Sequence, residues 1–354
     1  MEVLIPFEIE YAPIKSLSLI NFEKKPDEIY KGLEMQYLED DHVGKGYRII
    51  AYRTDNYIDV YDEKTLKYDE KETFDVAEKG SNQHVQVEMS NVRFQSTDGK
   101  VHMSFCFEDI YGRNIDVLIK EQTDKKSIPM NILAPIGVGS VKPSSLPVFF
   151  LYDFDFVRKN KTIVNVFIDK KKMKLDNFPF PVPMNMQWRY YSRYTPDSQI
   201  VEVFKSAKKK IKPIELDENG MYLNGIIEYK FQFTDGKAAL FQINIKSQRH
   251  PFSVEFQPAL SLEKNMKGSF TIEAEKCMGH IKGSYDIKRK EGKIKIHIIP
   301  DGGWTSVPTS TIVKMITGPK SMFSCWSKKY KYEQTIDLHD YYTESKWINE
   351  NIEL

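Results

Sequence analysis

Apolar and polar residues alternate along much of the chain. Residues 293–298 read Lys-Ile-Lys-Ile-His-Ile, and residues 102–108 read His-Met-Ser-Phe-Cys-Phe-Glu. Because successive side chains of a β-strand point to opposite faces, this period of two predicts half-buried antiparallel strands. The 3.6-residue period of an amphipathic helix is scarce, so the pattern predicts an all-β fold. Short helices are expected only within 26–38 and 339–354, where Trp347 and Ile348 would anchor the second one.

One turn sequence occurs twice. Residues 94–100 read Phe-Gln-Ser-Thr-Asp-Gly-Lys and residues 231–237 read Phe-Gln-Phe-Thr-Asp-Gly-Lys, so six of seven positions agree. A pattern of the form Pro-x-Gly-x-x-Ser/Thr-x-x-Pro-Ser/Thr-Ser follows each copy, at 135–145 and 300–310. Asp-Gly accepts the positive φ angles of tight hairpins, which predicts a hairpin tip at each Thr-Asp-Gly-Lys. The internal similarity predicts two related units, each an antiparallel β-barrel or β-sandwich.

The length of the chain also favours two domains. With 354 residues, the usual domain size predicts about two. We expect a first domain at 1–195, a linker at 196–210 and a second domain at 211–354 that ends in a helix. Prolines alternate with apolar residues within 177–188, which removes backbone donors and predicts an edge strand or a strap. This segment is either a plain connection or a strap across the mouth of a cavity.

Charge and composition exclude several classes of protein. Lys+Arg 51 against Asp+Glu 50 gives a net charge of +1, so we expect no nucleic-acid partner. No run of about 18 apolar residues is present, which predicts no integral membrane segment. Acidic residues interrupt the N-terminal apolar stretch, which argues against a signal peptide and favours a cytoplasmic location. The three cysteines and seven histidines lack the spacing of a disulfide framework or a metal site, so we expect neither metal nor cofactor.

The first candidate for chemistry is a pair of carboxylates. On a strand over 151–156, Asp153 and Asp155 would share one face about 7 Å apart, with aromatic residues on the other. In a cavity, mutual repulsion and desolvation would raise the pKa of one carboxyl and supply a proton donor. The alternative is that the aromatic face points inward and both carboxylates face solvent. His102 and Glu108 share a strand face in the same way, with the same alternative.

Two further segments are candidates for binding. Trp188 and Tyr190 would lie on one face of a strand, and Arg189 and Arg193 on the other. Aromatic faces and Arg forks can stack a sugar or hold an anionic head group, whereas the alternative is a buried strand with two surface arginines.

The second binding candidate is the loop at 300–305. Glycines in this loop would let the backbone approach a ligand beside Asp301 and Trp304. The alternative is a purely structural turn, since the copy at 135–140 lacks both of these residues.

The chain resembles a known family in its duplicated all-β architecture. Aromatic-rich strands such as 149–156 and the Gly/Pro loops carry the resemblance, which is to the two-domain lipocalin-like family that includes carotenoid hydratases of the hydroxyneurosporene synthase type and certain natural-product cyclases. No catalytic motif of that family is matched residue by residue. The resemblance implies an apolar cavity, within or between two barrels, that holds a hydrophobic or amphiphilic small molecule.

These observations favour a cofactor-free enzyme that hydrates, isomerises or cyclises such a molecule. Asp153, Asp155 or Asp301 would act as the acid. One alternative is a non-catalytic binding protein of the same fold, with Trp188, Tyr190 and Trp304 lining the pocket. Another is a carbohydrate-binding or glycan-processing β-sandwich, which would need carboxylates about 5 to 10 Å apart. The sequence leaves the oligomeric state open.

Overall fold

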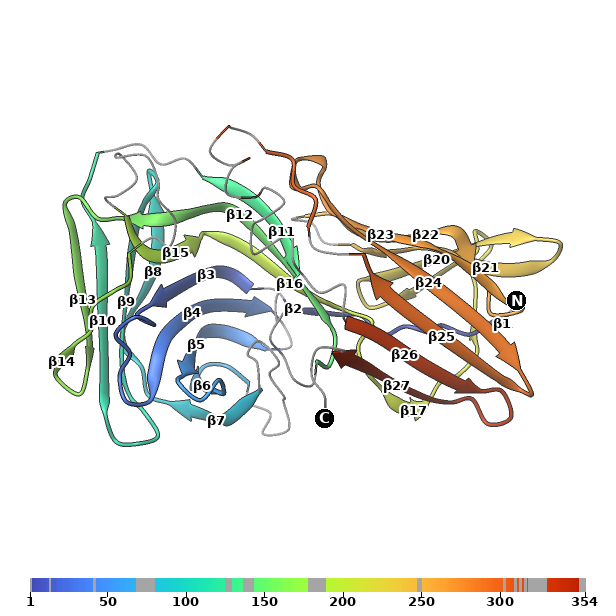
Figure 1. Ribbon diagram of the computed structural model, residues 1–354, viewed down its shortest axis with the longest axis horizontal. Coiled ribbons are helices and arrows are strands. Elements are labelled where there is room, and N and C mark those ends of the chain that lie inside the picture. Colours follow the sequence, from blue (N-terminus) through green and yellow to red (C-terminus); the bar gives the residue numbers. More distant parts are fainter. Residues whose placement is uncertain are drawn as a thin grey trace. The chain divides into compact units, whose positions relative to one another are not determined.

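The structure is a computed structural model that describes 2–12, 14–40, 43–67, 80–124, 129–135, 143–177, 189–246, 250–301, 304–308, 311, 314, 317 and 330–349. The fold is all-β, as the alternation predicted, and its sheets are largely antiparallel (Figure 1). The contacts between residues group the chain into two compact units. Unit 1 comprises Met1–Tyr11, Ile132–Phe149 and Val201–Leu354, and unit 2 comprises Ala12–Asn131 and Phe150–Ile200.

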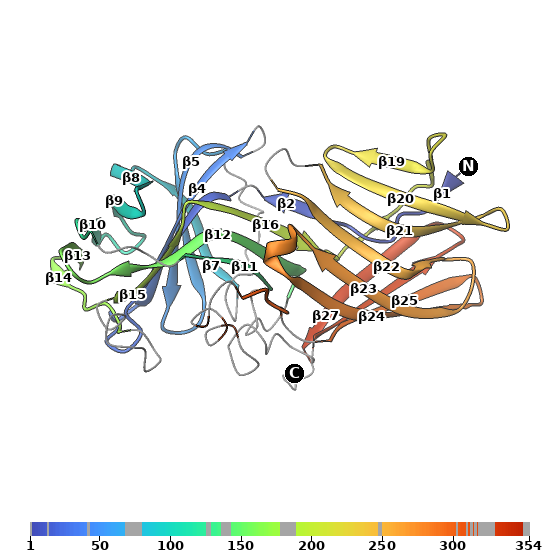
Figure 2. The same ribbon diagram turned by 90° about the horizontal axis from the view of Figure 1, so that it is seen from above.

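A ten-stranded sheet forms most of unit 1, and its strands are visible in Figure 2. Its order is β17 (Lys208–Lys210), β27 (Tyr342–Asn349), β26 (Tyr330–Asp337), β25 (Lys293–Pro300), β24 (His280–Lys290), β23 (Met266–Glu273), β22 (Phe252–Leu260), β21 (Lys237–Ile245), β20 (Ile227–Thr234) and β19 (Met221–Asn224). The short strands β1 (Glu2–Val3) and β18 (Ile214–Glu215) pair separately, and η2 (Lys276–Met278) is a 3₁₀ turn. In β25, Ile294, Ile296 and Ile298 are buried, as their alternation predicted.

Aromatic rings fill part of the interior of unit 1. The rings of Phe7 and Phe204 meet edge to face with centroids 4.8 Å apart, and Phe7 stacks on Phe256 at 5.7 Å. The indole Nε1 of Trp347 donates to the carbonyl oxygen of Phe204 at 2.8 Å. Aromatic pairs of this kind stabilise a core beyond the area that they bury.

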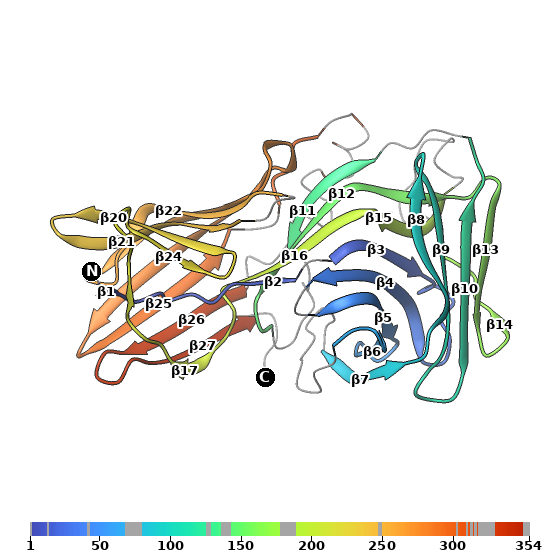
Figure 3. The same cartoon turned by 180° about the vertical axis from the view of Figure 1, so that it is seen from behind.

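Two further sheets supply the strands of unit 2, and Figure 3 shows them from behind. Four strands of the longer sheet also include residues of unit 1. The five-stranded sheet has the order β14 (Lys171–Lys172), β13 (Thr162–Ile168), β10 (Asn114–Glu121), β9 (Lys100–Glu108) and β8 (Ser90–Thr97). The longer sheet has the order β2 (Glu10–Ala12), β16 (Asp197–Val203), β12 (Leu146–Arg158), β15 (Arg189–Thr195), β3 (Ile14–Asn21), β4 (Tyr30–Asp40), β5 (Gly44–Arg53), β6 (Ile58–Glu63) and β7 (Ser81–Val87), with β11 (Met130–Pro135) paired to β12.

The main core of unit 2 lies where these two sheets face each other. Met103, Phe105 and Phe107 from β9 pack in one cluster with Leu33 and Met35 from β4. The other face of β9 carries His102, Ser104 and Cys106, which are half-buried. The apolar side of β9 therefore faces inward. Of the two interpretations given for the face with His102 and Glu108, this agrees with the second, in which the aromatic face points into the core.

Both copies of the repeated turn are hairpin tips, as predicted. Thr97 pairs with Lys100 and Thr234 pairs with Lys237. The two central residues have positive φ in each turn, at 52° and 68° for Asp98 and Gly99 and at 51° and 72° for Asp235 and Gly236. Positive φ at both positions is the signature of a type I′ turn. Duplication of the units as wholes stays a prediction.

Three expectations about local structure are corrected. Residues 30–40 and 342–349 are strands β4 and β27, where helices were expected. The segment 196–210, expected to be a linker, contains β16 and β17. Both helix predictions failed because polar or small residues occupy buried positions in these strands, which hides the period of two. Of the proline-rich segment, 178–188 lies outside the described residues.

Candidate functional site

Unit 1 contains a pocket of about 530 Å³. Its walls come from the ends of four hairpins, β20–β21, β22–β23, β24–β25 and β26–β27, and from β1 and the segment that follows it, near the end marked N in Figure 1. In an antiparallel sheet every second turn lies at the same end, so turns far apart in the sequence meet here. The second copy of the repeated turn contributes Phe231, Gly236 and Lys237 to the lining.

The pocket has an apolar floor. Phe231, Leu240, Leu260 and Ile294 line it and are all buried. Leu4, Leu262 and Leu338 add further apolar surface. Apolar walls of this kind suit a hydrocarbon chain, because binding removes the apolar surfaces of both the chain and the walls from water.

Charged side chains form the rim of the same pocket. Lys237, Arg289, Glu2 and Glu263 all belong to the lining and are exposed. Arg289 Nη1 donates to Glu263 Oε2 at 2.9 Å and to the Leu262 carbonyl oxygen at 3.3 Å. An apolar floor beneath a charged rim matches a molecule with one apolar and one polar end.

Unit 2 holds a buried carboxyl group on the sheet face opposite its core. Glu34 of β4 accepts hydrogen bonds from the Tyr52 hydroxyl at 2.7 Å and from Gln36 Nε2 at 2.6 Å. Burial raises the pKa of Glu34, and the two hydrogen bonds and the charge of Arg193 offset this only in part. A carboxyl group that keeps its proton at higher pH than usual can donate it.

Arg193, one of the binding candidates, lies on this same face. It pairs in register with Leu19, which pairs in turn with Glu34. The structure therefore brings a sequence-predicted cation next to a buried acid that the sequence analysis did not select.

A second buried carboxylate on this face is ionised. Asp62 of β6 accepts from Arg48 Nε at 2.6 Å and lies 2.9 Å from Nε2 of His84. Burial alone would raise the pKa of Asp62, but the hydrogen bonds from His84 and Arg48 lower it below its usual value. Glu34 and Asp62, on β4 and β6 with β5 between them, thus have pKa values shifted in opposite directions on one sheet face, a feature that is enriched at functional sites.

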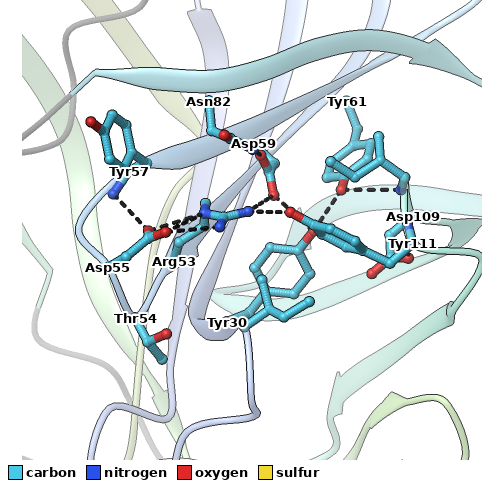
Figure 4. A network of polar contacts seen from close by, with 12 residues as sticks. Tyr30, Arg53, Thr54, Asp55, Tyr57, Asp59, Tyr61, Asn82, Asp109 and Tyr111 are labelled. Atoms are coloured by element: carbon cyan, nitrogen blue, oxygen red, sulfur yellow. Dashed lines mark hydrogen bonds and ion pairs between the residues drawn. The ribbon is translucent and has the colours of Figure 1, made fainter.

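Figure 4 shows a third polar cluster in unit 2, centred on Asp59. Its carboxylate accepts from Tyr30 at 3.1 Å, from Arg53 Nη1 at 3.0 Å and from Asn82 Nδ2 at 2.7 Å. The Tyr30 and Tyr61 hydroxyls lie 2.6 Å apart, and burial raises the pKa of both. Because these groups satisfy one another and the tyrosines stay protonated, we interpret the network as structural.

The structure separates the two aspartates of β12. Asp153 is exposed and its backbone N–H donates to Asn131 Oδ1 at 3.2 Å, whereas Asp155 is buried and its Oδ1 accepts from the Phe156 N–H at 2.7 Å. Asp153 has a φ of 49°, which breaks the alternation between them. The expected common face is therefore absent, because a local change of backbone conformation turns one side chain to the other side.

The loop candidates have structural partners. Trp304 is buried and its indole N–H donates to the Met278 carbonyl oxygen, while Thr305 forms a bridge with His280. Asp301 is exposed, and its backbone N–H donates to the Lys282 carbonyl oxygen at 2.9 Å. The unit 1 pocket lining includes neither Asp301 nor Trp304.

The remaining binding candidates are described only in part. Trp188 lies outside the described residues, and only the backbone of Arg189 and Tyr190, within β15, is described. Their role in binding stays a prediction.

Sequence reasoning missed the residues of the pocket floor and Glu34. The repeated turn was the one signal that pointed to the pocket, because Phe231 and Lys237 belong to it. Glu34 gave no signal, since a helix was expected over this segment and nothing in the sequence shows that the acid between Leu33 and Met35 is buried.

Comparison with known proteins found no matching family model, no matching curated protein and no matching solved structure. Within the described ranges, no group of three or more His, Cys, Asp or Glu side chains could hold a metal ion. The described part of the chain also has no helix with the length and apolar character needed to cross a membrane.

Proposed function

We propose that the chain binds an amphiphilic small molecule in the pocket of unit 1. The observation that carries the proposal is the combination of an apolar floor with a charged rim in a pocket of about 530 Å³. Small-molecule sites usually have volumes of about 300 to 1,000 Å³ and an apolar lining with a few polar groups.

The floor would supply most of the affinity. Each buried methylene group contributes about 0.8 kcal/mol, whereas a partly exposed ion pair such as Arg289–Glu263 contributes at most about 1 kcal/mol. An alkyl chain that reaches Leu240 and Leu260 therefore gains more from burial than its head group gains at the rim. This is also the kind of ligand that the lipocalin-like resemblance implies.

The binding proposal is tested with a variant that fills the pocket. Ala238 is half-buried in the lining, so Ala238→Trp should weaken binding of dodecanoate at least about tenfold, by steric exclusion. Phe233 is exposed and lies outside the lining, which makes Phe233→Trp the matched control with unchanged affinity. Isothermal titration calorimetry measures both. Equal affinity in the two variants would overturn the proposal.

A second candidate function is acid–base catalysis in unit 2. The supporting observation is Glu34, a carboxyl group shielded from water beside Tyr52 and Arg193. Hydration, isomerisation or cyclisation without a cofactor needs a proton donor of this kind. Here Glu34 would take the role that the sequence analysis gave to Asp153, Asp155 or Asp301.

The state of Glu34 is accessible to infrared difference spectroscopy. As pH rises, ordinary glutamates lose the C=O band of the protonated acid near their usual pKa, while Glu34 should keep this band to higher pH, and the band should be absent from Glu34→Gln. A spectrum with no protonated carboxyl lost in that variant would rule Glu34 out as the donor.

A further inference from the structure

We infer that the ligand of the unit 1 pocket carries an anionic head group, which Arg289 and Lys237 hold at the rim. This inference rests on the proposed binding function and adds the chemical class of the ligand. Arg289 is already fixed over the pocket by neighbouring groups. Its backbone N–H donates to Asn265 Oδ1 at 2.6 Å and its Nη1 donates to the Leu262 carbonyl oxygen at 3.3 Å.

Glu263 occupies the position in which an anionic ligand group would bind. Its carboxylate accepts from Arg289 Nη1 at 2.9 Å, which shows that the guanidinium can be reached by an acceptor at the rim. Arg presents five donors in a planar fork that suits carboxylate, phosphate and sulfate groups. The hydrogen bonds described for this side chain use only Nη1.

Exposure decides which partner of this pair is easier to release. The Glu263 side chain is 52% exposed and that of Arg289 is 37% exposed. A ligand anion that takes over Arg289 leaves Glu263 solvated by water. A cationic head group that takes over Glu263 would instead deprive the less exposed Arg289 of its acceptor, which costs more.

Lys237 supplies a second positive charge. Within the described residues it has no ion-pair partner. The equivalent residue of the other repeated turn, Lys100, pairs with Asp124 at 3.0 Å. In that turn, the Gly99 carbonyl oxygen also accepts from the Tyr194 hydroxyl at 3.2 Å and from Arg158.

The two copies of one turn therefore differ in what surrounds them. Around Gly99 and Lys100, other side chains of unit 2 bind the carbonyl oxygen and neutralise the charge. Gly236 and Lys237 line a pocket instead. This contrast points to Lys237 as a ligand contact rather than a residue needed by the turn itself.

Three amphiphiles with the same alkyl chain test the inference in calorimetric titrations of the full chain below their micelle concentrations. Dodecanoate should bind about tenfold more tightly than dodecyltrimethylammonium, because hydrogen bonds to charged groups are the stronger ones. Dodecanol should fall between them. If none of the three binds, the proposed function itself fails. If all bind equally, or the ammonium compound binds most tightly, the pocket stands and the inference is overturned.

Variants of the rim separate charge from general effects on the pocket. Arg289→Gln should weaken dodecanoate about fivefold and Lys237→Gln about threefold, while dodecanol is unaffected. Glu263→Gln should tighten dodecanoate about threefold, because Arg289 loses its competing acceptor. Lys290→Gln is the control, since Lys290 is exposed and outside the lining. An equal loss for dodecanol and dodecanoate in Arg289→Gln, or weaker dodecanoate binding in Glu263→Gln, would contradict the inference.

Discussion

The hydroxyl oxygens of Tyr30 and Tyr61 lie 2.6 Å apart in the interior of unit 2. Tyr30 also donates to Asp59, whose carboxylate binds Arg53 and Asn82 as well. One buried carboxylate therefore ties together four successive strands, β4 to β7 (Figure 4). In a low-dielectric interior, such a network stabilises the fold only when every member is satisfied.

Removing that carboxylate should destabilise unit 2. We expect Asp59→Ala to lower the free energy of unfolding by about 3 kcal/mol, because Arg53 and Tyr30 lose a buried partner. Asp55 also pairs with Arg53, but its side chain is 45% exposed, so Asp55→Ala should cost less than about 1 kcal/mol. Urea unfolding of both variants measures the difference, and equal costs would show that the buried network adds nothing.

Glu34 should make stability fall as pH rises. Its folded-state pKa is raised from an ordinary value of 4.5, so the folded state holds the proton more tightly than the unfolded state. The stabilisation is fully present below the unfolded pKa and is lost as pH rises through the folded pKa. Glu34→Gln should remove this slope, and the variant should gain stability relative to wild type above pH 4.5. Parallel slopes for the two proteins would contradict the assignment.

Asp62 should show the opposite dependence. Its folded-state pKa is lowered from an ordinary value of 3.8, so its contribution is present above that pH and is lost as pH falls through the folded pKa. Asp62→Asn should cost about 3 kcal/mol at neutral pH, because the buried guanidinium of Arg48 loses the carboxylate charge that pairs with it. This cost should shrink in acid. A cost that does not change between pH 7 and 3 would be inconsistent with an ionised Asp62.

The turn at Gly236 allows a test of backbone conformation alone. A Cβ atom at this residue would meet nothing within 4 Å, yet its φ is +72°. Gly236→Ala should therefore lower stability by about 1 kcal/mol through backbone strain only. Asp235→Asn is the control, because Asn tolerates positive φ equally well. Thermal unfolding that gives the same midpoint for both variants would argue against a type I′ turn.

The sequence predicted strands well where inward positions were apolar. Ile294, Ile296 and Ile298 gave a clear period of two, and the Asp-Gly pairs located both repeated turns. In β27 the inward positions include Thr343 and Ser345, which are buried although they are polar. Hydropathy alone could not reveal that strand, and a helix was predicted instead.

The candidate site was harder to predict because it depends on distant contacts. The pocket forms where four hairpin ends meet, which no local pattern of residues encodes. A local change of backbone conformation is also hidden from the sequence. Asp153 has a positive φ, which turns its side chain to the face opposite the one that strand alternation predicts. The burial of Glu34 could not be predicted either, because whether a polar strand face is buried depends on which other segments cover it.

Photoaffinity labelling with a dodecanoate that carries a diazirine at its chain end tests the central claim most directly. Peptide mass spectrometry should find saturable labelling in 231–240, 260–263 and 289–294, the segments that line the pocket, and unlabelled dodecanoate should compete it away. Saturable labelling confined to unit 2, or no saturable labelling, would contradict the claim that unit 1 binds an amphiphile.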